Sequence, residues 1–471
     1  MDDNQGIPYK EVLNRLDRSK TFFFFVIAAL IAALGGLIFG YDSGITGSAL
    51  LYVKPYFHLV PIEVSFYTSG LFLAGGIGAL VAGPITDKFG RKKMLILDGF
   101  LYGVFTLTLA LSINFIMLFV SRLMIGFAVG ADFAIATAYI SEFSPSSSRG
   151  RLAITQQLMI FSGLTIAYWT GYFLSKTGDW RLMIGIGILP AVILVSLRFV
   201  LPESPRWLAL NGKTEQLKKT LQKFNIFIDQ NIMPPPKAKP LRENLREIGY
   251  KRGFLIVGMV VIFLQISGIS VILYFGPTIY VHIGLSGSRA IYNTAISETL
   301  GAIFFALSFI LIDKWGRRKL MVLGYGGMVF SMLLMIGGLL SFSSGTVILA
   351  SIVIFSSITV FLAFEHLGVG GVSWVLQGET MPNEIRGTSA GWLASMNQFS
   401  NFAIVFIFPL WGAAYGYISF FELELIIDAF AFVFMLLLLP ETKGITLEQI
   451  PRIFTGKILQ IGKKDKGGNG K

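Results

Sequence analysis

Long apolar runs alternate with short polar segments along the whole chain. A transmembrane helix needs about 20 apolar residues to cross roughly 30 Å of hydrocarbon, and at these lengths only helices satisfy their backbone groups inside lipid. The pattern therefore predicts an all-α membrane protein with twelve transmembrane helices. The predicted spans are 22–52, 64–86, 94–117, 119–143, 152–175, 182–201, 253–281, 290–312, 319–341, 347–377, 387–415 and 419–439.

The first apolar run predicts a retained span, because it is too long for a secretory signal peptide and lacks a clear cleavage site. A long polar connection then divides the spans six and six. The predicted units are a cytoplasmic N-terminal segment at 1–21, a six-helix bundle at 22–201, a cytoplasmic linker with short helices at 202–252, a second six-helix bundle at 253–440, and a basic cytoplasmic tail at 441–471. The linker is either solvated or in contact with anionic lipid.

Basic residues predict the orientation, because loops rich in Lys and Arg stay in the cytoplasm. If odd-to-even connections face outward, those loops hold four basic residues, Lys54, Lys176, Arg181 and Arg289. Arg122 and Arg198 fall within spans, and the other 33 of the 39 Lys and Arg residues lie on the inner side. Both termini are therefore expected in the cytoplasm.

The two halves repeat one another. DKFGRKK at 87–93 returns as DKWGRRK at 313–319, and PES at 202–204 returns as PET at 440–442. Repeated membrane halves are typical of transporters, with the binding site where the halves meet near the midplane.

Composition excludes several other classes. Hydrophobic residues make up 54% of the 471 residues and charged residues only 14%, against about 25% charged in soluble domains. The net charge of +12 comes from short basic clusters between apolar runs, which is unlike a nucleic-acid surface. No cysteine is present and the three histidines form no metal-ligand cluster with nearby acids, so neither a metal nor an enzyme active site is predicted.

The repeated charged motifs predict a cytoplasmic network. A carboxylate at a helix end, a Gly at a tight bend and Arg forks can lock neighbouring helices together, and such a network closes one face of a carrier and opens in the other half-cycle. The predicted gate residues are Asp87, Arg91, Glu142, Arg149, Glu203, Arg206, Asp313, Arg317, Glu379, Arg386 and Glu441.

At this point the chain resembles a known family. GLIFGYDSGITG at 36–47, SRLMIGFAVG at 121–130, PESPRWL at 202–208, ISGISVILYFGP at 266–277 and PETKG at 440–444 follow in the order found in the major facilitator superfamily. PESPRWL together with PETKG favours its sugar porter family. The resemblance implies a twelve-helix fold in two pseudo-symmetric halves, a central solute site and transport by alternating access.

Ionisable residues inside the membrane are costly and each is a functional hypothesis. Asp42 lies deep in the first span and Arg122 in the fourth. An Arg stabilises the charged form of a facing Asp, and loss of its influence lets the Asp take a proton. The resemblance implies this proton-coupling role for the pair; a permanent structural ion pair is the alternative.

Three further residues are candidates for proton coupling. Asp132 lies ten residues after Arg122, and sugar porters usually lack it, whereas phosphate and organic-ion carriers of the superfamily often have a similar Asp. It is either functional or part of an inter-helix hydrogen bond. Glu365 and His366 lie side by side in the tenth span and either relay protons or join helices; Glu298 in the eighth span is similar.

A sugar site needs side chains that both donate and accept hydrogen bonds, and an aromatic plate for the apolar ring face. Carried over by matching motif positions, the candidates are Gln265, Ser270, Tyr274, Trp374, Asn397 and Asn401. Two positions depart from the family pattern. Leu264 stands where sugar porters commonly have the first Gln of a pair, and Leu164 stands where they have a Gln; Gln156 and Gln157 are nearby polar candidates.

These observations together predict a proton-coupled symporter of a sugar or polyol, located in the cell membrane and functional as a monomer. No cofactor is expected beyond protons as the coupling ion. The expected partners are a small polar solute and the lipid bilayer, without nucleic acid. The alternatives are a proton-coupled carrier of an organic anion or phosphate and, from another class, a membrane sensor that does not transport.

Overall fold

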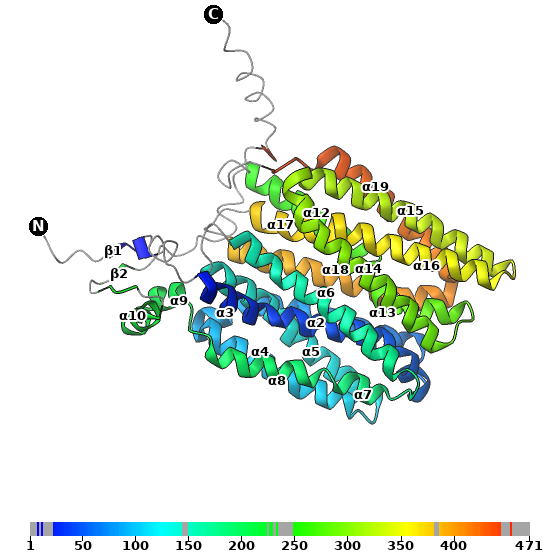
Figure 1. The fold of residues 1–471 in the computed structure, drawn as a ribbon, viewed down its shortest axis with the longest axis horizontal. Helices are drawn as coiled ribbons and strands as arrows, with labels where there is room; N and C mark the ends of the chain where they lie inside the picture. The colour runs from blue at the N-terminus through cyan, green and yellow to red at the C-terminus, as the bar shows by residue number, and fades with distance from the viewer. Residues whose placement is uncertain are drawn as a thin grey trace, which may run out of the picture.

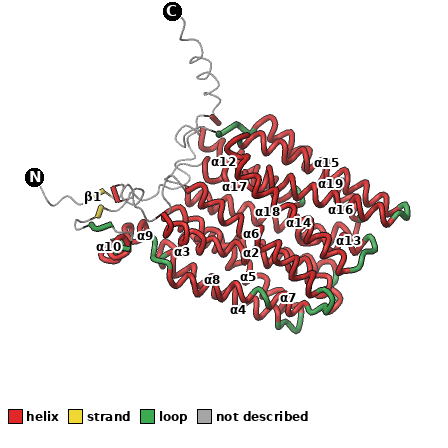
Figure 2. The backbone as a smooth tube through the Cα atoms, viewed as in Figure 1, coloured by secondary structure: helices red, strands yellow, loops and turns green. Residues whose placement is uncertain are grey.

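The fold consists of two bundles of long helices, as seen in a computed structural model that describes residues 7–8, 11–12, 22–143, 149–223, 226–228, 232–233, 248–380, 386–443 and 453–454 (Figure 1). Helices make up nearly all of the described chain (Figure 2). The expected all-α fold in two six-helix halves is therefore confirmed.

The N-terminal half contains six membrane segments, of which the last is divided. They are α2 (Phe22–Tyr56), α3 (Pro61–Phe89), α4 (Arg91–Ala110), α5 (Phe115–Phe143), α6 (Arg149–Leu174), and α7 (Trp180–Gly185) continued by α8 (Ile188–Val200). The connections between them are short, so sequential helices run antiparallel.

The C-terminal half repeats this plan with two divided segments. Its segments are α12 (Ile248–Ile266) continued by α13 (Ile269–His282), α14 (Gly287–Trp315), α15 (Arg317–Ser343), α16 (Val347–Phe364) continued by η1 (Glu365–Gly370) and α17 (Gly371–Thr380), α18 (Arg386–Tyr415) and α19 (Tyr417–Leu438).

Ten segments of the described chain are long and apolar enough to cross a membrane, and α6 and α19 complete the twelve. The helix α19 is strongly apolar apart from three acids, Glu422, Glu424 and Asp428. Large apolar side chains on the bundle surface, such as Ile348 at 80% exposure and Phe199 at 61%, suit contact with lipid rather than with water.

Two predicted spans differ in detail from the structure. The sixth is two helices rather than one. The seventh begins at Ile248, inside the segment expected as linker, because Tyr250 and the two following basic residues extend the helix; basic side chains at a membrane boundary keep their charge in water while their stems pack. The seventh is also broken at Ser267 and Gly268, where Gly268 has φ +82°.

The linker between the halves contains two short helices, α9 (Pro205–Leu210) and α10 (Thr214–Gln222). Its strand β2 (Ile232–Met233) pairs in parallel with β1 (Ile7–Pro8) near the start of the chain. These elements lie at one end of the bundles (Figure 1), which we call the linker end.

The halves meet along paired helices: α2 with α13, α3 with α18, and α6 with α14. Two hydrogen bonds join the halves near the end opposite the linker, from Trp169 Nε1 to Thr299 Oγ1 at 3.1 Å and from Ser175 Oγ to Ser288 Oγ at 2.8 Å. A third bond, from Tyr168 Oη to the Leu273 carbonyl, lies on the same interface. A further bond between the halves, from Ser395 Oγ to the Gly76 carbonyl at 3.1 Å, joins α18 to the middle of α3, so these bonds are not confined to the end away from the linker.

Equivalent glutamates bind the start of one helix in each half. Glu203 Oε1 accepts from the backbone amides of Arg91 and Lys92 at 2.9 and 3.1 Å. Glu441 accepts from the amides of Arg317 and Arg318 at 2.9 and 3.1 Å. Each carboxylate satisfies free N–H groups at the positive end of a helix, which explains why the PES and PET motifs recur.

The glycine before each of these helices yields a testable prediction. Gly316 has φ +92° and a Cβ there would meet the Glu441 carboxylate. Gly316→Ala should lower stability by about 1–3 kcal/mol through backbone strain alone, read as a lower melting temperature in detergent. Gly83→Ala is the control, because it lies inside α3 with open space around it. Equal melting temperatures for both variants would contradict this account of the turn.

Candidate functional site

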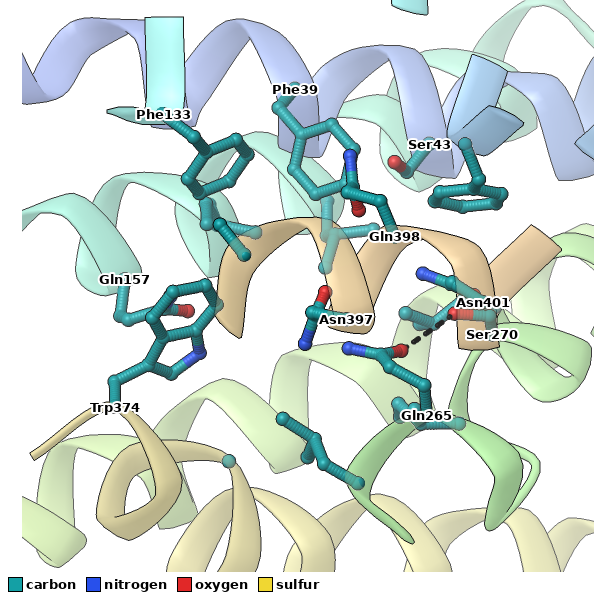
Figure 3. Close-up of a pocket in the computed structure, with 18 of the residues that line it drawn as sticks. Phe39, Ser43, Phe133, Gln157, Gln265, Ser270, Trp374, Asn397, Gln398 and Asn401 are labelled. Atoms are coloured by element: carbon teal, nitrogen blue, oxygen red, sulfur yellow. Dashed lines mark hydrogen bonds between the residues drawn. The ribbon is translucent and has the colours of Figure 1, made fainter. Parts of the chain in front are cut away.

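A cavity lies between the two halves at the middle of the bundle, and both halves contribute to its wall (Figure 3). It encloses about 830 Å³ of space between its wall atoms, counting the part that opens to solvent. The wall is formed by Phe39, Ser43, Phe72, Ala79, Gly130, Phe133, Gln157, Ile160, Phe161, Leu164, Leu264, Gln265, Ile269, Ser270, Leu273, Tyr274, Glu365, Gly370, Trp374, Ala394, Asn397, Gln398 and Asn401.

All six of the expected substrate residues line this cavity, and so does Gln157. Gln156 does not: it is buried against α5, where it accepts a hydrogen bond from Thr137 at 3.2 Å. Successive residues of a helix point about 100° apart, so only one of the two neighbouring glutamines can face the cavity.

Amide groups of α18 supply much of the polar wall. Asn397 Nδ2, Gln398 Nε2 and Asn401 Oδ1 are buried without a hydrogen-bond partner among the described residues. Across from them, Ser270 Oγ donates to Gln265 Oε1 at 3.5 Å (Figure 3). Buried polar groups normally find partners, so these amide atoms are available to a polar solute.

Aromatic rings form the other part of the wall. Trp374 stacks on Phe133 with ring centroids 6.0 Å apart and planes 10° from parallel, and this pair joins α17 of one half to α5 of the other. Phe39 meets Phe133 edge to face at 5.2 Å. The cavity thus has flat apolar surfaces beside its amides.

Among the described residues, Glu365 is the only acid in the wall, and no Lys, Arg or His lines the cavity. Anion sites in proteins are built from Arg and Lys side chains or from helix N-termini. The cavity wall therefore suits an uncharged polar solute.

Asp42 and Arg122 form a buried ion pair next to the cavity. Arg122 Nη1 lies 2.7 Å from Asp42 Oδ2, and the two residues are 0% and 3% exposed. Arg122 Nε donates to the Tyr67 carbonyl at 3.1 Å, while Nη2 has no partner among the described residues. The sequence correctly predicted that these residues meet, although neither side chain lines the cavity itself.

Tyr274 connects this pair with the cavity. Its ring packs edge to face on Phe72 at 5.3 Å, and its hydroxyl donates to Ser43 Oγ at 3.0 Å. Ser43 follows Asp42 in α2, and both Ser43 and Tyr274 line the cavity. A solute contacting Tyr274 is therefore one side chain away from the ion pair, and the bond joins the two halves.

Asp132 belongs to a different cluster. It pairs with Arg198 Nη2, while Arg198 Nη1 donates to Asp98 Oδ1 at 2.6 Å and to the Leu95 carbonyl at 2.6 Å. Asp132 is not part of the cavity wall. In this structure it serves as an inter-helix contact between α5 and α8.

Glu365 and His366 lie in the π-helical turn η1, and α14 supplies Glu298 beside them. His366 Nδ1 contacts Glu365 Oε2, and His366 Nε2 lies 3.4 Å from Glu298 Oε1. Single π turns often occur at functional sites. The fold therefore brings Glu298 of the eighth span next to Glu365 and His366 of the tenth span, which are far from it in the sequence.

Several residues of potential importance were missed from the sequence. Gln398, Phe39 and Phe133 line the cavity, and Gln398 could have been found beside the two predicted asparagines. Glu424 and Asp428 are both 0% exposed, and none of their carboxylate oxygens has a hydrogen-bond partner among the described residues. Their signal was visible as two acids four residues apart in the last apolar run.

The predicted gate residues form ties within the N-terminal half. Arg91 bonds to Asp87 at 2.7 Å and to Glu142 at 3.1 Å, and Ser204 Oγ donates to Glu142 Oε2 at 2.5 Å. Within the described part of the chain, no ion pair links Arg206 to this cluster.

The C-terminal half has a matching contact. Arg317 lies 3.4 Å from Asp313 and receives the Glu441 cap on its backbone. The side chains of Arg149, Glu379 and Arg386 lie outside the described residues. Every described ion pair and hydrogen bond of these motifs lies within one half. These described interactions therefore stabilise each half and do not connect the two halves.

The fold and this site define a membrane carrier with a solute cavity between two repeated halves. Residues 28–454 match the sequence model of the family described as "Sugar (and other) transporter". The chain belongs to this transporter family, and the expected membership of the major facilitator superfamily is confirmed.

Individual relatives agree over nearly the whole length. The chain is 34% identical over 387 residues to the D-xylose transporter of Levilactobacillus brevis, covering 80% of this chain and 84% of that one. It is 28% identical over 456 residues to the arabinose-proton symporter of Bacillus subtilis strain 168, covering 93% and 96%. A partially occluded, inward-open structure of the xylose transporter XylE from E. coli matches with a TM-score of 0.76 and 25% identity, covering 91% and 100%.

The Arg198 cluster yields a prediction on stability. Arg198→Met leaves Asp98 and Asp132 buried without their cation, which should cost about 3–5 kcal/mol and lower the melting temperature and yield in detergent. The triple neutral variant, with Asp98→Asn and Asp132→Asn added, should recover much of this loss. A single Arg198→Met variant as stable as the parent would disprove the structural role of the cluster.

Proposed function

We propose that this protein is a proton-coupled symporter of a neutral sugar or polyol. One observation carries the proposal: the cavity between the halves is lined by amides, hydroxyls and aromatic rings, with no cationic side chain among its described wall residues. Amides of Gln and Asn both donate and accept, as the hydroxyl groups of a sugar require. The Trp374 ring offers a plate for the apolar face of a pyranose.

The same wall argues against an organic anion or phosphate. Such a solute would meet the Glu365 carboxylate and find no Arg or Lys among the described residues to pair with. Asp132, which motivated the anion reading, is occupied by Arg198. The names of the relatives, an arabinose-proton symporter and transporters of xylose, agree with a neutral sugar.

Coupling to protons is proposed to reside in Asp42 and Arg122. In the ion pair the two buried charges compensate each other. If Arg122 moves away during the cycle, Asp42 becomes an unpaired buried carboxylate, which is costly, and it takes up a proton. The Tyr274–Ser43 bond ties this exchange to the solute and to the contact between the halves.

Alternating access follows from the way the halves are held. The hydrogen bonds within each half, around Glu203 and Glu441, favour movement of each half as a rigid unit. The hydrogen bonds between the halves are those that must break and re-form during transport. We further propose that the protein acts as a monomer in the cell membrane with both termini cytoplasmic, and that it uses protons and no other cofactor.

The coupling proposal is tested by Asp42→Asn. Asn cannot ionise, so proteoliposomes with an inward proton gradient should lose uphill sugar accumulation, while exchange of sugar at equal pH continues. Glu422→Gln, an exposed acid on α19, is the control and should accumulate sugar like the parent. Uphill uptake by Asp42→Asn would defeat the coupling role of this pair.

The substrate proposal is tested with a thermal-shift panel of D-xylose, L-arabinose, D-glucose and myo-inositol against phosphate, succinate and gluconate. A neutral member should raise the melting temperature, and Trp374→Ala should weaken its binding about tenfold, or roughly 1.4 kcal/mol. Trp392→Ala is the control, because Trp392 is 50% exposed and outside the cavity wall. A response to anions alone would favour the organic-anion carrier instead. A sensor would bind sugar without any flux in proteoliposomes.

A further inference from the structure

A chain of three ionisable side chains is buried in the C-terminal half with no role in the mechanism above. His366 lies between Glu365 and Glu298, with one ring nitrogen facing each carboxylate. Exposure is 0% for His366 and Glu298 and 2% for Glu365. We call these three residues the triad.

The hydrogen-bond geometry allows the protons of the triad to be counted. A neutral imidazole has one N–H and one lone pair, and a lone pair facing a carboxylate oxygen is repulsive. Each nitrogen–oxygen contact therefore needs one proton. With both contacts filled, two carboxyl groups and one histidine carry a net charge of −1, and one further proton makes the triad neutral.

The surroundings of the triad do not compensate that charge. Two tyrosines are within electrostatic reach of the triad: Tyr168 of α6 is influenced by Glu298, and Tyr325 of α15 is influenced by Glu365 and Asp428. Asp428 is itself a buried acid, and its neighbour Ser267 is uncharged. Neither Lys nor Arg in the described chain bonds to the triad. An uncompensated charge in a dry site is costly, so a third proton is favoured while the site is closed.

The cavity and the interface between the halves both adjoin the triad. Glu365 forms part of the cavity wall. Phe161, from α6 of the opposite half, covers the His366 ring with centroids 4.1 Å apart and also contacts Phe305 at 4.3 Å. Movement of one half against the other would lift Phe161 from His366 and let water hydrate the charged form.

We propose that Glu298, His366 and Glu365 form a second proton-binding site, which takes up one proton from the cavity when the halves close and releases it when they part. The proton enters at the Glu365 carboxylate and can pass through the imidazole to Glu298. This inference rests on the proposed proton-coupled function. With Asp42 as the first site, the protein would move two protons with each sugar molecule.

The stoichiometry is tested by reversal potentials in proteoliposomes with valinomycin-clamped membrane voltage and equal pH on both sides. The probe is radiolabelled D-xylose, or the sugar with the largest thermal shift in the panel above, at a tenfold gradient. Net flux stops at about 59 mV for one proton per sugar and about 30 mV for two. The parent protein should reverse near 30 mV.

Glu298→Gln should move the reversal potential to about 59 mV. In this variant His366 and Glu365 form a neutral pair and need no third proton, while Gln keeps the shape and a hydrogen-bond acceptor. Glu365→Gln is expected to give the same shift, and serves if Glu298→Gln is poorly produced. Asp132→Asn should leave the value near 30 mV, because Arg198 keeps Asp98 as its partner.

The outcomes separate this inference from the proposed function. A parent value near 59 mV, or triad variants that stay near 30 mV, would overturn the second site and leave sugar–proton symport standing. A shift in Asp132→Asn with unchanged triad variants would move the second proton to the Arg198 cluster and also overturn it. Absence of any voltage dependence in the parent would instead refute proton coupling as a whole.

Discussion

Charge buried in a dry helical bundle has to be compensated inside that bundle, and this constraint organises both halves. In the N-terminal half each fully buried arginine has acids around it: Arg122 has Asp42, and Arg198 has Asp98 and Asp132. These pairs lie between helices rather than along one helix, so they also determine which helices are neighbours. Removal of either arginine leaves buried acids without a cation beside them.

The C-terminal half meets the same constraint differently. Its described interior holds four acids, Glu298, Glu365, Glu424 and Asp428, with a single histidine among them. Compensation there depends on protons rather than on arginine. The two halves share a helix plan and the glutamate caps at Glu203 and Glu441, yet they differ in how they keep their interiors neutral, and this difference gives the pseudo-symmetric fold two inequivalent sides.

Much of the fold could be predicted because twelve apolar runs of membrane-spanning length leave little choice of architecture. The break at Ser267 and Gly268 could not, since the residues around it are as apolar as those of an unbroken helix and Gly occurs throughout the spans. The π turn at Glu365 was equally hidden. It depends on packing between helices that come from distant parts of the sequence.

Prediction of the site was uneven for a similar reason. Motif positions identified Gln265, Trp374 and Asn397, because a residue's position in a motif also indicates the direction in which its side chain points. Without such a register, Gln156 and Gln157 were equivalent in sequence, and only one faces the cavity. Contacts between side chains far apart in the chain, such as Asp132 with Arg198, follow from the helix arrangement and could not be read from spacing along one span.

The position of the cavity explains how a neutral solute could govern charged groups that it does not touch. The solute would contact Tyr274 and Glu365 on the wall, and each of these leads to a buried charge cluster, one through Ser43 to Asp42 and the other through His366 to Glu298. Both routes start in the C-terminal half and one of them crosses to the N-terminal half. A change at the wall therefore alters hydrogen bonds that hold the halves together at the same time as it alters the compensation of buried charge, and a carrier needs these two events to occur together.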